Sequence, residues 1–134
     1  MSVTSNLPGL DDLLTRLSTP AGKKNFLVYS NNKYRNVPTE RIAYFFVKCE
    51  SSMIMCFDQQ EFSVSHSLDK IQDLLPGSQF FRVSRQYLIN FNAVKEVEHY
   101  FARKLLVNLV IPVRDKLLVS KEKVSGFLEW LDNR

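Results

Sequence analysis

The 134-residue sequence is poor in the residues that most catalytic and metal sites need: it has two cysteines, two histidines and four glycines. Cys49 and Cys56 have no second cysteine pair beside them, and the histidines match no metal-binding spacing, so we expect no zinc site and two buried thiols. The sequence also lacks a glycine-rich phosphate loop and a nucleophile motif. It therefore predicts a protein without enzymatic activity, cofactor or metal.

Long apolar runs are missing as well. A membrane-spanning helix needs about 18 to 20 apolar residues, and no such run and no secretory signal pattern is found in the sequence. The chain nevertheless has 45% hydrophobic residues, which at this length is enough for the core of one domain. We expect one compact domain with a tail, located in the cytoplasm.

Charge is distributed unevenly along the chain. Residues 1–78 contain eight Lys or Arg and eight Asp or Glu, whereas residues 79–134 contain ten and six. The net charge of +4 therefore lies in the C-terminal part. A basic surplus of this kind suits contacts with phosphate groups, although basic residues can equally well solvate a surface.

Two regions differ in their pattern. Near the start, four leucines with helical spacing predict a short amphipathic helix that ends at Pro20: Leu10, Leu13, Leu14 and Leu17. We interpret residues 1–25 as a linker carrying this helix and residues 26–134 as the folded domain. The leucine face could pack on this domain, pair with a second chain or contact another domain.

After the linker, short apolar segments alternate with turn residues at hairpin spacing. Strands are predicted at 26–29, 34–37, 42–48, 53–57, 61–64, 94–101, 105–111 and 116–119. Residues 42–48 are apolar on both faces, which indicates a central strand. The asparagines at 31 and 32 suit the left-handed backbone of a tight turn. The pattern predicts a mainly β domain.

Two helices are predicted within this β domain. Ser67 can cap a helix that runs to Leu75. Ser120 can cap a final helix, and four residues would form its apolar face: Val124, Phe127, Leu128 and Leu131. The chain is therefore expected to close by packing a C-terminal helix on the β core.

The segment Phe80–Asn90, with the sequence FFRVSRQYLIN, places two arginines and a serine among apolar residues. Arg85 is flanked by residues that should be buried, so packing would hold its stem while its guanidinium projects. A held guanidinium can bind guanine through two hydrogen bonds in the major groove. The alternative is an ordinary surface arginine or an internal ion pair. Asn90 is expected to stabilise a backbone turn.

Together with the elements that follow it, this segment resembles a known family. FFRVSRQYLINFNAVKEVEHYF, then a hairpin and LLVSKEKVSGF, are similar to the LytTR family of DNA-binding domains, and the upstream PTERIAYF is similar to its opening strands. The resemblance covers about residues 26–131. It implies an elongated β sandwich of about ten short strands with small helices, including a C-terminal helix.

The resemblance also implies a function. LytTR domains are usually the output domains of two-component response regulators that control transcription. The chain would bind double-stranded DNA through loops inserted in the major groove, as two copies on direct repeats. A sensor kinase would act on it through a receiver domain, for which the residues before Phe26 leave no room. A stand-alone regulator without a receiver remains the alternative.

The family's DNA contacts can be carried over to matching positions. One loop follows the central strand and corresponds here to Glu50, Ser51 and Ser52. A second corresponds to Ser84 and Arg85, where the family more often has histidine in place of the serine. Because serines are short, the contacts from the first loop would be short-range or bridged by water.

The third contact comes from the family's Val-Ser-Arg element, in which Lys121 replaces the arginine and lacks its planar fork. Lys121 is also expected at the N-terminus of the last helix, where a nearby anion would offset the helix dipole. Arg82 and the hairpin residues Arg103 and Lys104 are further candidates for phosphate contacts.

Two other function classes remain open from the sequence. An RNA or single-strand binder would need aromatic residues exposed along a sheet, but here five of them are predicted in the core: Tyr44, Phe45, Phe46, Phe80 and Phe81. A protein-interaction or ligand-sensing β domain would use the N-terminal leucine face instead. Binding to duplex DNA that weakens steeply with salt and prefers a repeated sequence would support duplex-DNA binding over both alternatives.

Overall fold

The computed structural model describes residues 22–133, so the helix predicted around residues 10–17 lies outside the described residues. Strands dominate this part of the chain, as predicted. The ten strands are β1 (Asn25–Ser30), β2 (Lys33–Pro38), β3 (Ile42–Lys48), β4 (Ser51–Cys56), β5 (Glu61–Val64), β6 (Phe80–Ser84), β7 (Tyr87–Asn90), β8 (Val94–His99), β9 (Leu105–Leu109) and β10 (Leu117–Val119).

Short helical segments connect or flank these strands. The α-helices are α2 (Leu68–Leu74) and α3 (Val124–Asp132), and the 3-10 turns are η1 (Thr39–Arg41), η2 (Phe91–Ala93), η3 (Phe101–Arg103) and η4 (Lys121–Lys123). The Ser67 hydroxyl accepts a hydrogen bond from the Lys70 backbone N–H at 3.2 Å, which confirms its predicted role as the cap of α2.

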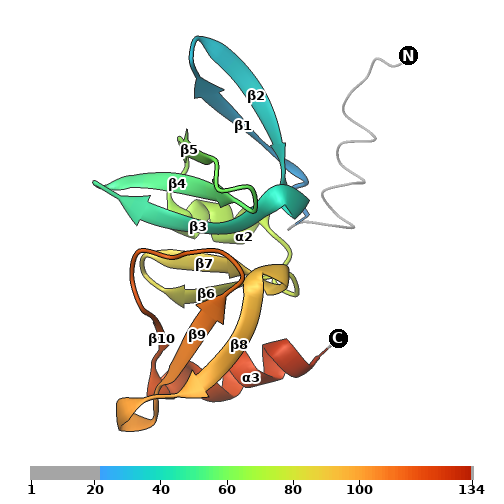
Figure 1. Ribbon diagram of the computed structural model, residues 1–134. Helices are drawn as coiled ribbons and strands as arrows, with labels where there is room; N and C mark the ends of the chain where they lie inside the picture. The colour runs from blue at the N-terminus through green and yellow to red at the C-terminus, as the bar shows by residue number, and fades with distance from the viewer. Residues whose placement is uncertain (1–21, 134) are drawn as a thin grey trace.

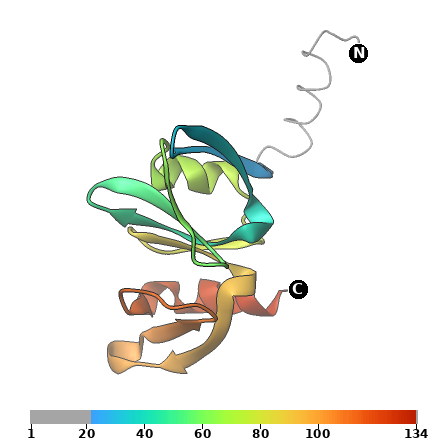
Figure 2. The ribbon, with the colours of Figure 1, turned by 45° about the horizontal axis from the view of Figure 1, so that its top comes forward.

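The strands form three antiparallel sheets that are stacked along the length of the molecule (Figure 1). The central sheet has five strands in the order β5-β4-β3-β7-β6. The β1–β2 hairpin and α2 lie on one side of it, and the three-stranded sheet β10-β9-β8 with α3 lies on the other (Figure 2). This arrangement confirms the predicted elongated sandwich with a C-terminal helix.

Strand β3 is the middle strand of the central sheet, and its two faces are buried in two different cores. Ile42 and Phe45 belong to the core beneath the β1–β2 hairpin and α2. Tyr44 and Phe46 belong to the core shared with the three-stranded sheet and α3. A strand with both faces buried must be apolar on both, which explains why residues 42–48 show no alternation.

Three hairpin turns contain a pair of residues with left-handed backbone conformations, at 31–32, 49–50 and 102–103. Asn31 and Asn32 have φ values of 54° and 62°, as predicted for the β1–β2 turn. Cys49 and Glu50, with φ values of 50° and 65°, form an equivalent turn between β3 and β4 that the sequence did not indicate. Because this turn needs only these two residues, Ser51 and Ser52 belong to β4, and the predicted loop at these serines is wrong. The prediction of a buried Cys49 is also wrong, since its side chain is exposed, whereas Cys56 is buried.

The last helix begins later than predicted. The Ser120 side chain makes no capping hydrogen bond, and the 3-10 turn η4 separates it from α3, which begins at Val124. Lys121 therefore does not lie at the N-terminus of an α-helix, and the dipole argument for it is wrong. Leu128 is 46% exposed instead of packed, while Phe127 is fully buried and Trp130 packs on Phe81 with 5.3 Å between ring centroids.

Candidate nucleic-acid interface

Three segments that are far apart in sequence lie along one edge of the molecule, which we call the turn edge: the turns at residues 49–50 and 85–86, and η4 (left side of Figure 1). The backbone N–H of Val47, on the strand that leads into the first segment, donates to the Gln86 carbonyl of the second at 3.1 Å. Lys123 Nζ of the third segment donates at 3.5 Å to the carbonyl of Arg82, on the strand that leads into the second. The three loops implied by the family resemblance are thus brought together.

The β6–β7 turn presents Arg85 outward. Ser84 Oγ accepts a hydrogen bond from the Gln86 backbone N–H at 3.2 Å and so closes the turn from its first residue. The Arg85 side chain is exposed and makes no hydrogen bond or ion pair with any residue of the described range 22–133. All five guanidinium N–H donors of Arg85 are therefore available to a partner.

Arg82 stabilises this turn from beneath. Its Nε donates to the Ser84 carbonyl and its Nη2 to the Arg85 carbonyl, both at 2.7 Å. Its Nη1 donates to Asp69 at 2.8 Å and to Gln72 at 3.0 Å on α2. These four bonds use most of the donors of a side chain that is only 16% exposed, so Arg82 has a structural role in addition to the predicted phosphate contact.

Asn90 anchors the other end of the same strand pair and is 1% exposed. Its Nδ2 donates to the Ile42 carbonyl at 2.8 Å, and its Oδ1 accepts from Gln79 Nε2 at 2.6 Å and from the Asn92 backbone N–H at 2.9 Å. The amide thus joins β7 to β3 and caps η2. This geometry confirms the structural role predicted for Asn90.

The β3–β4 turn is less basic than the other two segments. Ser51 is exposed, but Ser52 is 9% exposed and lies on the face of β4 that carries Ile54 and Cys56 into the core. Lys48 pairs with Glu61 on β5, with 3.1 Å between Nζ and Oε1. Of the two predicted serine contacts, only Ser51 has its hydroxyl on the exposed side of the strand.

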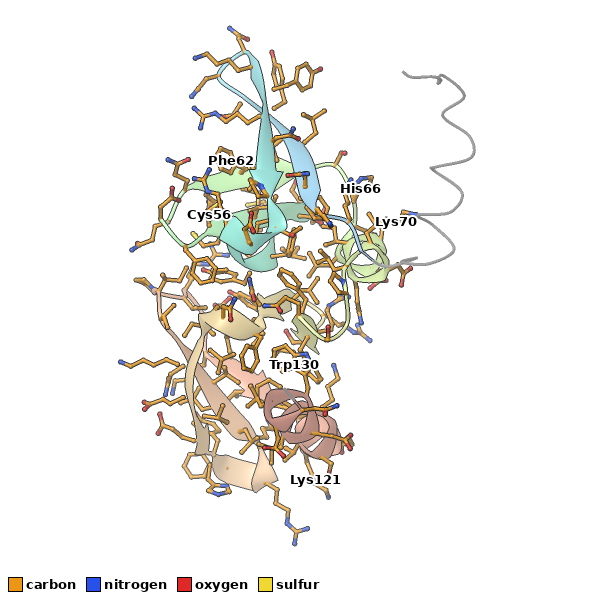
Figure 3. All side chains as sticks on the ribbon, turned by 90° about the vertical axis from the view of Figure 1, so that its right-hand side faces the viewer. Cys56, Phe62, His66, Lys70, Lys121 and Trp130 are labelled. Atoms are coloured by element: carbon orange, nitrogen blue, oxygen red, sulfur yellow. The ribbon has the colours of Figure 1, made fainter. Side chains whose placement is uncertain are left out.

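The η4 segment supplies two further cations at the far end of the turn edge. Lys121 and Lys123 are both exposed, and Lys121 lies near the start of α3 at the end of the molecule opposite the β1–β2 hairpin (Figure 3). The Lys121 side chain makes no hydrogen bond or ion pair within the described part of the chain. Lys123, which sequence reasoning did not single out, is held beside β6 by its bond to Arg82.

The predicted hairpin residues Arg103 and Lys104 lie at the β8–β9 tip, defined here as residues 100–104. Arg103 is exposed and Lys104 is half-buried. The tip also exposes Phe101, which no sequence argument had selected. The strand predicted at 94–101 included Phe101, whereas β8 ends at His99 and Phe101 begins the 3-10 turn η3.

A part-buried polar contact connects the central sheet to the C-terminal half of the sandwich. The Tyr87 hydroxyl donates to Asp115 Oδ2 at 2.7 Å, which connects β7 to the segment between β9 and β10. Burial, and then the hydrogen bond to Asp115 and its negative charge, raise the pKa of Tyr87 well above the usual value of 10.0. The phenol therefore stays protonated and keeps this contact at neutral pH.

Groups suited to metal binding are absent from residues 22–133, where no three His, Cys, Asp or Glu side chains come close enough to hold an ion. No helix in this range is long and apolar enough to cross a membrane. The functional groups that the described structure does bring together are exposed cations on a rigid edge.

Comparison with known proteins agrees with this geometry. The family profile described as the LytTr DNA-binding domain matches residues 32–132. The chain belongs to the LytTR family. LytTR domains bind DNA and are related to the output domains of response regulators that regulate transcription, and the family is defined by this binding and not by a reaction.

One relative and one solved structure extend the match. The sensory transduction protein LytT of Enterococcus faecalis is 27% identical over 88 residues, which make up 65% of this chain and 36% of that protein. The chain thus spans about a third of the length of this relative. The LytTr DNA-binding domain of a methyl-accepting/DNA response regulator from Bacillus cereus has the same fold, with a TM-score of 0.70, 21% identity, and coverage of 82% of this chain and 98% of that one.

Proposed function

We propose that this LytTR domain reads a specific duplex sequence by placing its turn edge against the major groove. The observation that carries the proposal is the unpaired Arg85 guanidinium on a turn that is held by Arg82 and by Ser84. Because hydrogen bonds already hold the turn, little backbone conformational entropy is lost when Arg85 contacts a base. Lys121 and Lys123 would add phosphate contacts beside it, and Ser51 a short polar contact.

Arg82 and Ser52 take different parts in this proposal. Arg82 positions the turn, since most of its donors are already bonded, and Ser52 supports β4 from its buried face. Ser84 closes the turn with its hydroxyl, so its short side chain leaves more of the groove to Arg85. A histidine at this position, which is common in the family, would extend further.

The experiment starts from duplexes that the purified chain selects from a random library. Arg85→Ala should lower affinity for the selected site by about 10- to 100-fold, equivalent to about 1–3 kcal/mol, while affinity for random duplex changes little. Arg35→Ala, at an exposed arginine on β2, is the matched control and should have no effect on either. Equal losses of Arg85→Ala on both duplexes would remove Arg85 from base recognition.

We further propose that the domain acts in the cytoplasm as the output part of a longer response regulator, bound as two copies to direct repeats. The support is the relative LytT, which is described as a sensory transduction protein and is much longer than this chain. A receiver domain and a sensor kinase would then control it. Two copies bound to a repeated site, and one copy to a single half-site, are expected in sedimentation experiments; one copy on both would contradict the repeat model.

A further inference from the structure

The β8–β9 tip exposes the aromatic ring of Phe101 to solvent. Phe101 is 81% exposed, the highest value among the large apolar side chains of the described range. Its only ring contact there is an edge-on packing against Tyr100, with 5.2 Å between centroids. Burial of a phenylalanine side chain contributes about 1.5–3 kcal/mol, so a partner that covered this ring would gain a free energy of that order.

The backbone of the tip holds this ring outward. Ala102 and Arg103 have φ values of 57° and 62°, although neither is glycine. The reversal is closed by two backbone hydrogen bonds, from Lys104 N–H to the Phe101 carbonyl at 3.1 Å and from Tyr100 N–H to the Lys104 carbonyl at 2.9 Å. Left-handed residues other than glycine are uncommon and cost conformational energy. The tip is therefore a defined projection.

Sheet register places the tip next to the turn edge. Leu105 pairs with His99 on β8 and with Val119 on β10, so these three residues form one row across the sheet. The chain continues past this row from His99 into the tip and from Val119 into η4, which contains Lys121. The tip and η4 are thus at the same end of the three-stranded sheet, as the lower left of Figure 1 shows.

Charge around the ring indicates which partner fits. Arg103 is exposed beside it, Lys104 follows, and Lys116 Nζ lies 5.4 Å from the centroid of Tyr100. Cations on the same tip as an exposed ring suit a partner that offers anions and apolar atoms together. The minor groove of a duplex does so, since phosphates line its walls while sugar C–H groups and base edges form its floor, and phenylalanine wedges are used there with arginine or lysine.

We propose that the β8–β9 tip is an additional DNA contact, in which Phe101 packs into the minor groove flanking the site read by the turn edge, and Arg103 and Lys104 bind the adjoining phosphates. The proposal rests on the proposed function, because it needs the turn edge to face the duplex. It goes beyond that function in adding an apolar contact outside the base-reading loops.

The test compares Phe101→Ala with Tyr34→Ala on a selected duplex at several salt concentrations. Tyr34 is 72% exposed on the β1–β2 hairpin at the opposite end of the molecule, so it controls for the loss of an exposed aromatic ring. Phe101→Ala should lower affinity about tenfold or more without changing the salt dependence, since no charge is lost. Tyr34→Ala should bind as the unmodified chain does.

Two further measurements locate the contact. Arg103→Ala should reduce the slope of log affinity against log salt by about 0.9, the value for one phosphate contact. Removing about five base pairs, half a helical turn, from one flank of the duplex should weaken the unmodified chain to the level of Phe101→Ala and leave Phe101→Ala itself unchanged. Removing the other flank should leave the difference in affinity between the unmodified chain and Phe101→Ala unchanged.

The outcomes separate this inference from the proposed function. If Phe101→Ala binds normally while Arg85→Ala loses its site, the tip contact is wrong and the base-reading function stands. If Phe101→Ala still binds more weakly than the unmodified chain on both trimmed duplexes, whichever flank is removed, the ring does not contact flanking DNA and the inference is overturned. If Phe101→Ala instead changes self-association of the free chain in sedimentation, the tip is a protein contact and the inference is also overturned. If the chain selects no duplex, both proposals fail.

Discussion

The paired strands β6 and β7 and the turn that joins them use similar side chains in opposite ways. In the strands, the polar groups of Arg82, Tyr87 and Asn90 each bond to a partner from a different part of the chain. In the turn, Arg85 directs its guanidinium outward and meets none within the described range. Arg82 and Arg85 are thus only three positions apart, but Arg82 holds the turn by hydrogen bonds and Arg85 extends from it into solvent.

The difference shows how the fold prepares a binding edge. A buried polar group stabilises the fold only when its hydrogen bonds are made, and removing one partner leaves the other unsatisfied at a cost of about 1–3 kcal/mol. An exposed cation carries no such penalty and contributes little to stability. Substitutions of these strand residues should therefore lower the free energy of unfolding. Substitutions of exposed cations on the turn edge should lower DNA affinity alone.

The largest effect is expected at Asn90. Asn90→Leu keeps the volume but leaves the Ile42 carbonyl and the Asn92 N–H without their partner, so the free energy of unfolding should fall by about 3 kcal/mol in urea titrations. Asn92→Ala is the control, because the exposed Asn92 contributes its backbone N–H to this network. A loss below about 1 kcal/mol for Asn90→Leu would contradict the anchoring role.

The second-largest effect is expected at Arg82, where a substitution should affect both the stability of the strands and DNA binding by the turn. Arg82→Met keeps the apolar stem and removes four hydrogen bonds, so we expect a loss of about 2 kcal/mol in stability together with weaker specific DNA binding, because the turn loses its support. The Asp69 bond adds little to this, since that carboxylate is almost fully exposed. Arg82→Lys should restore little, and full recovery with lysine would show that the planar fork is not needed.

The contact between Tyr87 and Asp115 predicts a pH dependence. The raised pKa of Tyr87 means that the folded chain holds the phenolic proton more tightly than the unfolded chain, whose tyrosines titrate near 10.0. Stability should be complete below pH 10 and should fall as the pH rises above it. Tyr87→Phe should lower stability by about 1–2 kcal/mol and reduce the alkaline slope. Part of the slope should remain, because burial also raises the pKa of Tyr44.

The smallest effect on stability is expected at Lys121, whose side chain should contribute to DNA binding and not to folding. Lys121→Ala should leave the free energy of unfolding within about 0.5 kcal/mol of the unmodified chain. It should reduce the salt slope of DNA binding by about 0.9. Lys70→Ala, at an exposed lysine on α2 that Figure 3 shows in the other half of the molecule, is the matched control. An unchanged slope for Lys121→Ala would place Lys121 outside the phosphate contacts.

Much of the fold could be predicted because each signal acts over a few residues. Apolar segments with turn residues between them indicated the strands, Asn31 and Asn32 indicated their turn, and Ser67 indicated the start of α2. The start of α3 was predicted wrongly because Ser120 has the right side chain for a cap but is followed by a 3-10 turn. The turn at Cys49 and Glu50 was missed because neither residue type prefers a left-handed backbone.

Local patterns of residue type were enough to predict a mainly β domain with β3 at its centre, and the resemblance of FFRVSRQYLIN to the LytTR family indicated a DNA-binding domain. The folded structure was needed to show that Arg82 supports the turn while the Arg85 guanidinium is unpaired within the described residues, that Ser52 faces the core, and that Phe101 projects beside η4. The reason is physical: whether a polar or apolar side chain is satisfied depends on groups that are distant in sequence, and only folding brings those groups to it.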